Sequence, residues 1–340
     1  MLTVLRCAQE RPFTSGCRLA TGRSAVLLLI ERWKPTCVFM PCFVPAGIIR
    51  PFQHAGVPIV FYRLNQDLRT AMGDLYLKVK ETRAERPLIV SIRYFGYSQP
   101  TQDMVDLAHT AGGILLEDCA HALFDGSKTS DVVLYSLNKF LPVTDGAIMV
   151  SRRNSVNVSI NESALAPLHQ EAIAAYTAHL EINARIAAYD SARTVAQLAM
   201  ASAEAYSAYY AMIDSDMSPR SQSAASRAVE AATDMVTMSE SRKMKSTMLR
   251  AAMPSGLLVR REPAQFAFPV RCAGRRREMV AALMRVGVLP SFFEGLWDYV
   301  PAEGFDFERE FLADHVLLPI HEGVTFASIS KIASALREFT

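Results

Sequence analysis

The chain has 340 residues, of which 36 are Lys or Arg and 34 are Asp or Glu, so its formal net charge is +2. Half of the residues are hydrophobic and 21% are charged, a balance that excludes a disordered chain and is typical of a globular enzyme. The basic residues are scattered apart from short runs such as 275–277, which Glu278 follows. A solvated helix face explains that run better than a nucleic-acid patch, so we expect no nucleic-acid partner.

Cysteines and apolar runs give no sign of a metal or a membrane. The six cysteines include no C-x-x-C pair and no paired Cys/His ligand set, which favours a reduced, cytoplasmic protein without a metal site. The apolar run from Ala25 to Ile30 is far too short to span a bilayer. The N-terminus also lacks a signal peptide with a small-residue cleavage site.

Short apolar runs alternate with amphipathic stretches from Gly22 to Gly146, which predicts an α/β domain with a largely parallel sheet. The expected strands are Cys37–Met40, Pro58–Tyr62, Leu88–Ile92, Gly113–Glu117, Val132–Tyr135 and Ala147–Val150. The expected helices are Ser24–Trp33, Ala46–His54, Gln66–Lys80 and Thr101–Thr110.

The composition changes after Gly146, because the next glycine is Gly256. Alanine, methionine, glutamate and arginine are frequent there, which predicts long helices with a break near Pro219. The end of the chain predicts a small α+β domain with strands at Gln265–Val270 and Val316–Pro319 and helices at Arg277–Val286 and Phe326–Phe339. The length accommodates both parts, and we place the large domain, with its long helices, at 1–235 and the small domain at 236–340.

Two predicted strands end in residues that suit a cofactor site. The buried strand Ile114–Leu116 runs into two acids, the second of which is Asp118, and the strand ending at Tyr135 is followed by Ser136 and Lys139. Ligands of open α/β sheets bind at the carboxyl ends of such strands. Taken alone, Asp118 is explained by a helix-capping aspartate, and Lys139 by a surface lysine.

Several segments in collinear order carry a resemblance to a known family. They are Thr21–Ala25, Ile92–Gly96, Leu116–Ala122 (LEDCAHA), Ser130–Val133, Ser136–Lys139, Asp145–Gly146 and Leu318–His321. Together they cover most of the chain and resemble the DegT/DnrJ/EryC1/StrS family of aminotransferases, which depend on pyridoxal 5′-phosphate (PLP) and have PLP fold type I. The order of the segments carries more weight than any one of them.

The resemblance implies PLP as the cofactor and gives roles to four residues. Lys139 would be the Schiff-base lysine, and Asp118 would pair with the pyridinium nitrogen, which matches the amine and the acid that PLP chemistry requires. His121 would contact the cofactor near its 3-oxygen, and Ser136 would contact the phosphate. A hydrogen-bonded core histidine remains an equal alternative for His121.

The same resemblance places the phosphate at the start of a helix. Gly22, Arg23 and Ser24 would offer backbone N–H groups to it, and a helix N-terminus favours an anion on physical grounds as well. An ordinary capped helix start is the alternative. Phe43 would stack on the pyridine ring, although core packing explains a single phenylalanine better.

The sequence departs from the family pattern at three points. Ser136 lies three positions before Lys139, whereas many members have the serine five positions before the lysine, and Ala147 replaces the second glycine of a Gly-Gly pair. The Asn-containing segment that reaches the partner subunit's phosphate is missing. The segment 218–221, with Arg220, is the candidate substitute.

The function that follows is transfer of an amino group from an amino acid, expected to be glutamate, to a keto sugar, either free or nucleotide-linked. Lys139 would also move the α-proton. A PLP-dependent elimination or dehydration on the same scaffold, or a catalytically silent fold-type I module, are the alternatives. The resemblance further implies a homodimer whose active site lies at the subunit interface.

Overall fold

The structure, a computed structural model, describes residues 16–123, 126, 128–152, 156, 160–186, 192–292 and 303–339. Its main sheet has seven strands in the order β1-β7-β6-β5-β4-β2-β3. Strands β2 to β6 are parallel, and β7 is antiparallel to both of its neighbours, which confirms the mostly parallel α/β prediction. The strands are β1 (Cys17–Leu19), β2 (Cys37–Pro41), β3 (Ile59–Tyr62), β4 (Pro87–Ile92), β5 (Ile114–Asp118), β6 (Val132–Ser136) and β7 (Ala147–Ser151).

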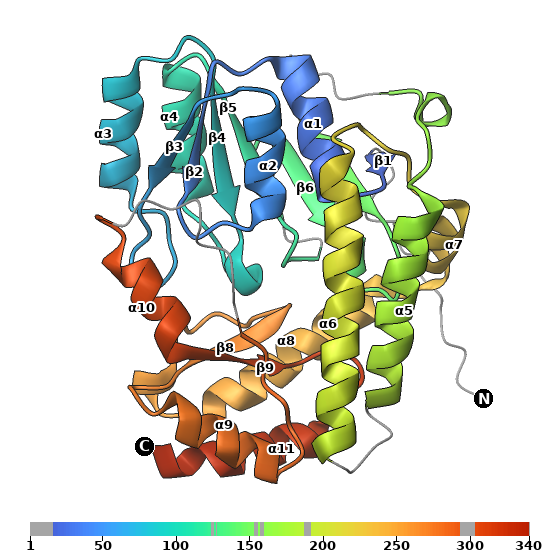
Figure 1. Cartoon of the computed structure of the whole chain (residues 1–340). Helices are drawn as coiled ribbons and strands as arrows, with labels where there is room; N and C mark the ends of the chain where they lie inside the picture. The colour runs from blue at the N-terminus through green and yellow to red at the C-terminus, as the bar shows by residue number, and fades with distance from the viewer. Residues whose placement is uncertain are drawn as a thin grey trace, which may run out of the picture.

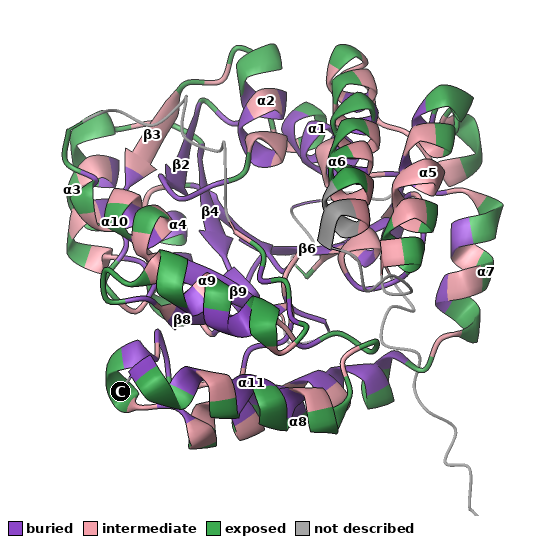
Figure 2. Ribbon diagram, turned by 60° about the horizontal axis from the view of Figure 1, so that its bottom comes forward, coloured by how far each residue is buried: buried purple, intermediate pink, exposed green. Residues whose placement is uncertain are grey.

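Helices cover both faces of this sheet. Figure 1 shows α1 and α2 in front of the sheet and α4 behind it, with α3 beside the edge strand β3. Every residue of β2, β4 and β5 is buried, as expected for continuous apolar runs in a parallel sheet, and Figure 2 shows this buried centre. The helices are α1 (Gly22–Trp33), α2 (Ala46–His54), α3 (Met72–Thr82) and α4 (Thr101–Thr110).

The start of α1 lies at the same edge of the sheet as the ends of β5 and β6. Strands β1 and β6 are both antiparallel to β7, so they run in the same direction, and α1 begins just after β1. Thr21 caps the helix: its backbone is extended, and its side chain accepts a hydrogen bond from the N–H of Ser24 at 3.1 Å. The turn 20–24 is therefore brought to the carboxyl edge.

Four helices follow β7, and two of them form a long hairpin. Figure 1 shows α5 and α6 side by side along one flank of the molecule. The predicted break at Pro219 is confirmed, because α6 ends at Ser215 and α7 begins at Ala224. The helices are α5 (Gln170–Ile186), α6 (Ala192–Ser215), α7 (Ala224–Ala232) and α8 (Met235–Ala252). Within the described part of the chain, no helix combines the length and the apolarity needed to cross a bilayer.

A second, smaller layer lies below the carboxyl edge of the main sheet (Figure 1). We call the described part of residues 235–339 the C-terminal layer. It contains α8 and a two-stranded antiparallel sheet. The strands and helices predicted for this region are confirmed, and nearly all of their ends lie within two residues of the predicted positions. Its other elements are β8 (Ala267–Arg271), β9 (His315–Pro319), α9 (Arg276–Arg285), α10 (Asp306–Asp314) and α11 (Phe326–Leu336). The domain boundary at 235/236 remains a prediction.

Three features differ from the sequence prediction. The helix expected at Gln66–Lys80 begins only at Met72, because Leu68 has a φ of 63° and the N–H of Asn65 is bonded to the carbonyl of Arg69 at 2.8 Å. Left-handed backbone at a leucine ends any helix that passes through it. The short strand β1 and the helix α10 were not predicted.

Replacing Phe39 with alanine tests the packing of the central sheet. Phe39 is 0% exposed in β2, so Phe39→Ala removes a large buried side chain and leaves a cavity. We expect the free energy of unfolding to fall by about 3–5 kcal/mol, measured by urea denaturation. Phe326→Ala is the matched control: Phe326 is 44% exposed, and its loss should cost less than about 1 kcal/mol. Equal losses in the two variants would contradict this account of the core.

Candidate active site

Asp118, the last residue of β5, is a buried carboxylate at the carboxyl edge of the sheet. Its side chain is 3% exposed, and Oδ1 accepts a hydrogen bond from the N–H of Ala120 at 2.8 Å. Burial raises the pKa of Asp118 to about 6, although the Ala120 N–H and the charge of Lys139 act in the opposite direction. The fold therefore keeps a carboxylate where ionisation is unfavourable.

Glu117, the residue before it, is buried in a different environment. Successive side chains of a strand point to opposite faces, so Glu117 and Asp118 face different sides of the sheet. Glu117 forms an ion pair with Arg93 at 3.4 Å and accepts a hydrogen bond from Ser130 Oγ at 3.0 Å. An arginine thus neutralises Glu117, whereas the charge that lowers the pKa of Asp118 is that of Lys139.

Lys139 ends a short 3₁₀ turn that follows β6. The turn is fixed at its start, because the N–H of Leu137 donates to the carbonyl of Gly146 at 2.8 Å, and Ser136 Oγ donates to Asn138 Oδ1 at 3.0 Å. Lys139 Nζ lies 5.7 Å from the centre of the Phe266 ring. Among the described residues the ammonium group has no carboxylate or hydrogen-bond partner.

His121 lies beside both groups. Its ring stacks on Phe266 at 4.0 Å with an interplanar angle of 9°, and on Phe95 at 6.0 Å. Burial and, second, the charge of Lys139 hold the pKa of His121 well below its usual value, so the imidazole is neutral at pH 7.

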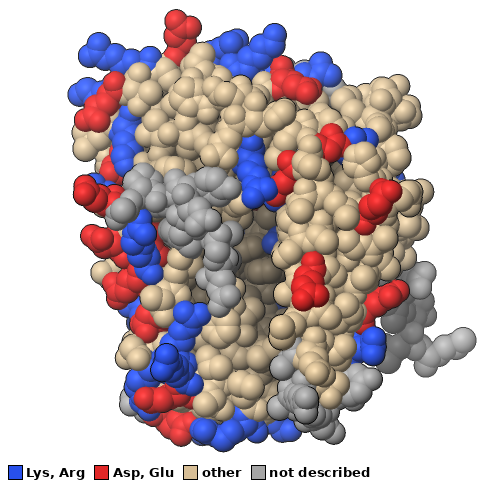
Figure 3. All heavy atoms as spheres, in the orientation of Figure 1, with Lys and Arg blue, Asp and Glu red and all other residues tan. Residues whose placement is uncertain are grey.

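Lys139 is therefore close enough to both Asp118 and His121 to influence their ionisation. The Lys139 charge lowers the pKa of both other groups, yet Lys139 and Asp118 form no direct ion pair. Figure 3 shows the surface hollowed alongside α6, where the carboxyl edge of the sheet faces the C-terminal layer.

The C-terminal layer is attached at this point. The N–H of Gln265 donates to the carbonyl of Phe95 at 2.7 Å, and Gln265 Oε1 accepts from the N–H of Leu123 at 3.2 Å. Arg242 of α8 donates to the Gln265 carbonyl at 3.3 Å, and its guanidinium lies 4.8 Å from the centre of the Phe140 ring. The layer thereby contacts Phe140, which follows Lys139 directly, and Leu123, in the chain just after Asp118.

The predicted phosphate turn lies at the start of α1, and side chains that the sequence did not single out surround it. Arg23 forms an ion pair with Asp214 of α6 at 2.5 Å, and Arg50 pairs with the same carboxylate. Ser24 Oγ accepts a hydrogen bond from the N–H of Arg220 at 3.2 Å. The segment suggested as a substitute for the missing Asn segment thus contacts the turn of its own chain.

The backbone of that turn still offers donors. Within the described residues, the N–H groups of Gly22 and Arg23 have no acceptor. A Cβ added to Gly22 would be in ordinary van der Waals contact with Leu134 Cδ2 of β6, at 3.8 Å, so a side chain at this position would meet no clash. A phosphate suits this place by charge, because unbonded amides at a helix N-terminus favour an anion.

Phe43 packs mainly against other aromatic side chains. It is 2% exposed, stacks on Tyr94 at 5.2 Å and meets the edge of Phe311 at 5.3 Å. The structure gives this phenylalanine the surroundings of a core residue, which was the alternative explanation from the sequence.

Sequence reasoning missed several residues of the site. Phe266 and Asp214 reach it from distant parts of the chain, and Tyr176 of α5 donates to the carbonyl of Asn138 at 3.4 Å. A single phenylalanine, aspartate or tyrosine carries no local motif. Only the tertiary fold places Phe266 beside Lys139, Tyr176 beside Asn138 and Asp214 beside Arg23.

Comparison with known proteins finds no matching family model and no match among curated proteins. Solved structures do match across nearly the whole chain. A DegT/DnrJ/EryC1/StrS aminotransferase from Brucella abortus has 15% sequence identity and a TM-score of 0.62, covering 97% of this chain and 87% of its own. The aminotransferase TlmJ from Streptoalloteichus hindustanus has 17% identity and a TM-score of 0.64, with coverages of 96% and 86%.

The third match is Spr1654 from Streptococcus pneumoniae, described as a sugar aminotransferase, in its PMP-form. Its identity is 12% and its TM-score 0.66, with coverages of 97% and 88%. At such identities the likeness concerns the fold, and it agrees with the sheet order and the two-layer arrangement described above. The chain therefore has the PLP fold type I architecture of the DegT/DnrJ/EryC1/StrS aminotransferases.

Proposed function

We propose that the protein is a PLP-dependent aminotransferase that moves an amino group from an amino acid to a keto sugar. The observation that carries the proposal is the buried carboxylate of Asp118, coupled to the unpaired amine of Lys139 at neighbouring strand ends. The matching fold supports it. Burying a carboxylate without a direct counter-ion costs stability, so a fold that keeps one there indicates a functional reason.

The residues present suit PLP at both of its ends. Lys139 offers the amine, Asp118 the anion for the pyridine nitrogen, and the amides of Gly22 and Arg23 a place for the phosphate. When bound, PLP supplies an aldehyde that exchanges with amines and a pyridinium ring that withdraws electrons from the bond to be broken.

Lys139 and Asp118 would divide the proton chemistry. Asp118, once ionised, would hold the proton on the pyridine nitrogen, because an anion in a poorly solvated site favours a neighbouring cation. Lys139 Nζ would take and return the proton at the substrate carbon that carries nitrogen. Its short 3₁₀ turn, fixed by the Leu137 hydrogen bond, orients that nitrogen.

Three further residues would bind and orient. His121 is neutral, so it would offer a hydrogen bond near the 3-oxygen of the cofactor without adding charge. Ser136 would turn its hydroxyl from Asn138 to the phosphate. Phe43 would support the site indirectly, as part of the aromatic cluster that it forms with Tyr94 and Phe311.

The partners that we propose are glutamate as donor, a free or nucleotide-linked keto sugar as acceptor, and a second copy of the chain, in the cytoplasm. Several solved structures with this fold are described as sugar aminotransferases, which supports the acceptor class. Met200 on α6 is 66% exposed, and the α5–α6 hairpin offers apolar area for a homodimer.

Lys139→Ala tests the amine. Purified protein given PLP should absorb visible light, and borohydride should fix the cofactor to the peptide that contains Lys139, detected by mass spectrometry. Lys139→Ala should lose both signals and all transamination, whereas Lys331→Ala, at an exposed position of α11, should keep them. Cofactor fixed to another lysine would overturn the assignment.

A donor and acceptor panel separates transamination from the alternatives. Glutamate should convert the visible band, and a keto sugar should then restore it. The amount of 2-oxoglutarate formed should equal the amount of keto sugar that is aminated. Release of ammonia or water without that conversion would identify an elimination instead. Failure to retain PLP in excess would point to a silent module.

Asp118→Asn tests the cost of the buried carboxylate. Because the pKa of Asp118 is raised from 3.8 to about 6, the folded protein binds this proton more tightly than the unfolded chain, so Asp118 destabilises the fold increasingly as the pH rises from 4 to 6. Without cofactor, the free energy of unfolding of Asp118→Asn relative to that of wild type should rise by about 3 kcal/mol from pH 4 to pH 7. Urea denaturation at each pH measures it.

The same variant should lose function. Asp118→Asn should lower the transamination rate at least about 100-fold, because the ring loses the charge that keeps it protonated. Asp106→Asn, at an exposed position of α4, should change neither the rate nor the pH dependence of stability. An Asp118→Asn protein that is fully active would refute the role given to this carboxylate.

Sedimentation tests the second copy. At micromolar concentration we expect the mass of a dimer, and Met200→Glu should shift the protein toward monomer by placing a charge in an apolar contact. A stable monomer that carries PLP and transaminates would contradict the homodimer proposal.

A further inference from the structure

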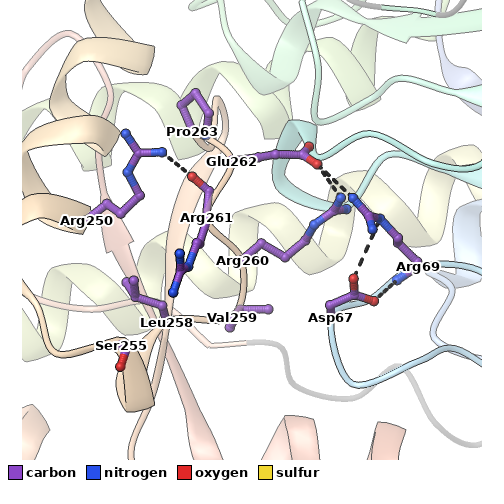
Figure 4. A pocket seen from close by; sticks show the side chains of 10 residues that line it. All are labelled: Asp67, Arg69, Arg250, Ser255, Leu258, Val259, Arg260, Arg261, Glu262 and Pro263. Atoms are coloured by element: carbon purple, nitrogen blue, oxygen red, sulfur yellow. Dashed lines mark hydrogen bonds and ion pairs between the residues drawn. The ribbon is translucent and has the colours of Figure 1, made fainter.

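A cavity of about 720 Å³ lies away from Lys139, where the loop after β3 meets the chain between α8 and β8. Figure 4 shows the ten residues that line it, from both the main-sheet part and the C-terminal layer. None of Lys139, Asp118 and His121 is among them. Its volume is within the range of small-molecule sites in proteins.

Four arginines and two acids line the cavity, so its net charge is positive. Glu262 is bonded by Arg260 and Arg69, and Asp67 also pairs with Arg69 at 3.6 Å (Figure 4). Glu262 further accepts hydrogen bonds from Ser98, through its N–H at 2.8 Å and its Oγ at 2.7 Å. Two arginines and two carboxylates thus neutralise one another and form one rigid wall.

This wall is well fixed. The Arg260 side chain is 3% exposed, its guanidinium lies 5.1 Å from the centre of the Tyr97 ring, and it donates to the Ser98 carbonyl at 2.7 Å. Burial opposes ionisation of Glu262, but the Ser98 hydrogen bonds and the two arginine charges outweigh it, so the pKa of Glu262 lies below its usual value. The carboxylate is therefore not available to the other two arginines.

Arg250 and Arg261 are those remaining cations. Arg250 donates to the main-chain carbonyl of Arg261, and Figure 4 shows the Arg261 side chain extending toward Leu258 and Val259. Neither guanidinium has a carboxylate partner among the described residues. Leu258, Val259 and Pro263 add an apolar surface between the charges.

We propose that this cavity binds an organic phosphate, with Arg250 and Arg261 contacting the phosphate and the apolar wall contacting the organic part. Two unpaired positive charges match a phosphate monoester, which carries nearly two negative charges at pH 7, and guanidinium groups bind phosphate oxygens in pairs. The apolar wall favours an ester over the inorganic ion. This site is separate from the proposed PLP site and does not depend on it.

Phenyl phosphate is a suitable probe, because it joins a dianion to an apolar ring. Isothermal titration at 0.15 M salt, on protein loaded with PLP or, where none is retained, on the protein as purified, should show saturable binding at this one site. Inorganic phosphate lacks the ring and phenol lacks the charge, so each should bind at least tenfold more weakly. Absence of saturable binding, or inorganic phosphate binding as tightly, would overturn the proposal.

Variants place the binding in the cavity. Arg250→Gln combined with Arg261→Gln should weaken phenyl phosphate at least tenfold. Arg32→Gln combined with Arg277→Gln removes the same charge from exposed helix positions outside the cavity and should leave the affinity within twofold. An equal loss in both double variants would indicate unspecific charge screening and refute the site.

One single variant keeps the test valid if the first pair fails to fold. Arg261 is exposed and donates no hydrogen bond within the described residues, so Arg261→Gln should leave the fold intact and still weaken binding at least threefold. Unchanged affinity in Arg261→Gln would contradict the proposal. Loss of PLP binding alone would bear on the proposed function and leave this result untouched.

Discussion

The burial of the Asp118 carboxylate beside Lys139 is the constraint on which the rest of the site depends. Strand β5 is buried on both faces, so its last residue reaches the sheet edge without leaving the low-dielectric interior. Water cannot stabilise the charge there, and the N–H of Ala120 offsets only part of the loss. A ligand with a cationic group next to Asp118 would relieve the remaining cost.

The neighbouring elements bring an amine and a helix start to the edge of the sheet where Asp118 lies. Lys139 stands on a short turn at the end of the neighbouring strand, and the start of α1 lies at the same edge because β1 and β6 run in the same direction. The helix start at Gly22 lies 96 residues before the acid, Asp118, which is 21 residues before the amine, Lys139. Parallel strand order alone is enough to bring them to one edge.

The central part of this arrangement was predictable from sequence because its signals are local. Buried parallel strands appear as short apolar runs, and the polar residues that follow them mark the carboxyl edge, which made Asp118 and Lys139 candidates. Their roles came from the family resemblance. Leu68 illustrates the opposite case: its left-handed backbone depends on the turn that joins Asn65 and Arg69, so the apolar pattern suggested a helix that starts too early. Asp214 and Phe266 gain their positions only through tertiary packing, and Phe43 is surrounded by aromatic side chains that are distant in sequence.

The attachment of the C-terminal layer restricts the directions from which a ligand could approach Lys139. Gln265 joins this layer to Phe95 and Leu123, and Phe266 lies flat on His121, so the layer is held against the base of the site. Swinging it outward would break these hydrogen bonds and expose the stacked rings to water. A ligand that leaves these contacts intact would enter from the side, along the hollow beside α6 (Figure 3).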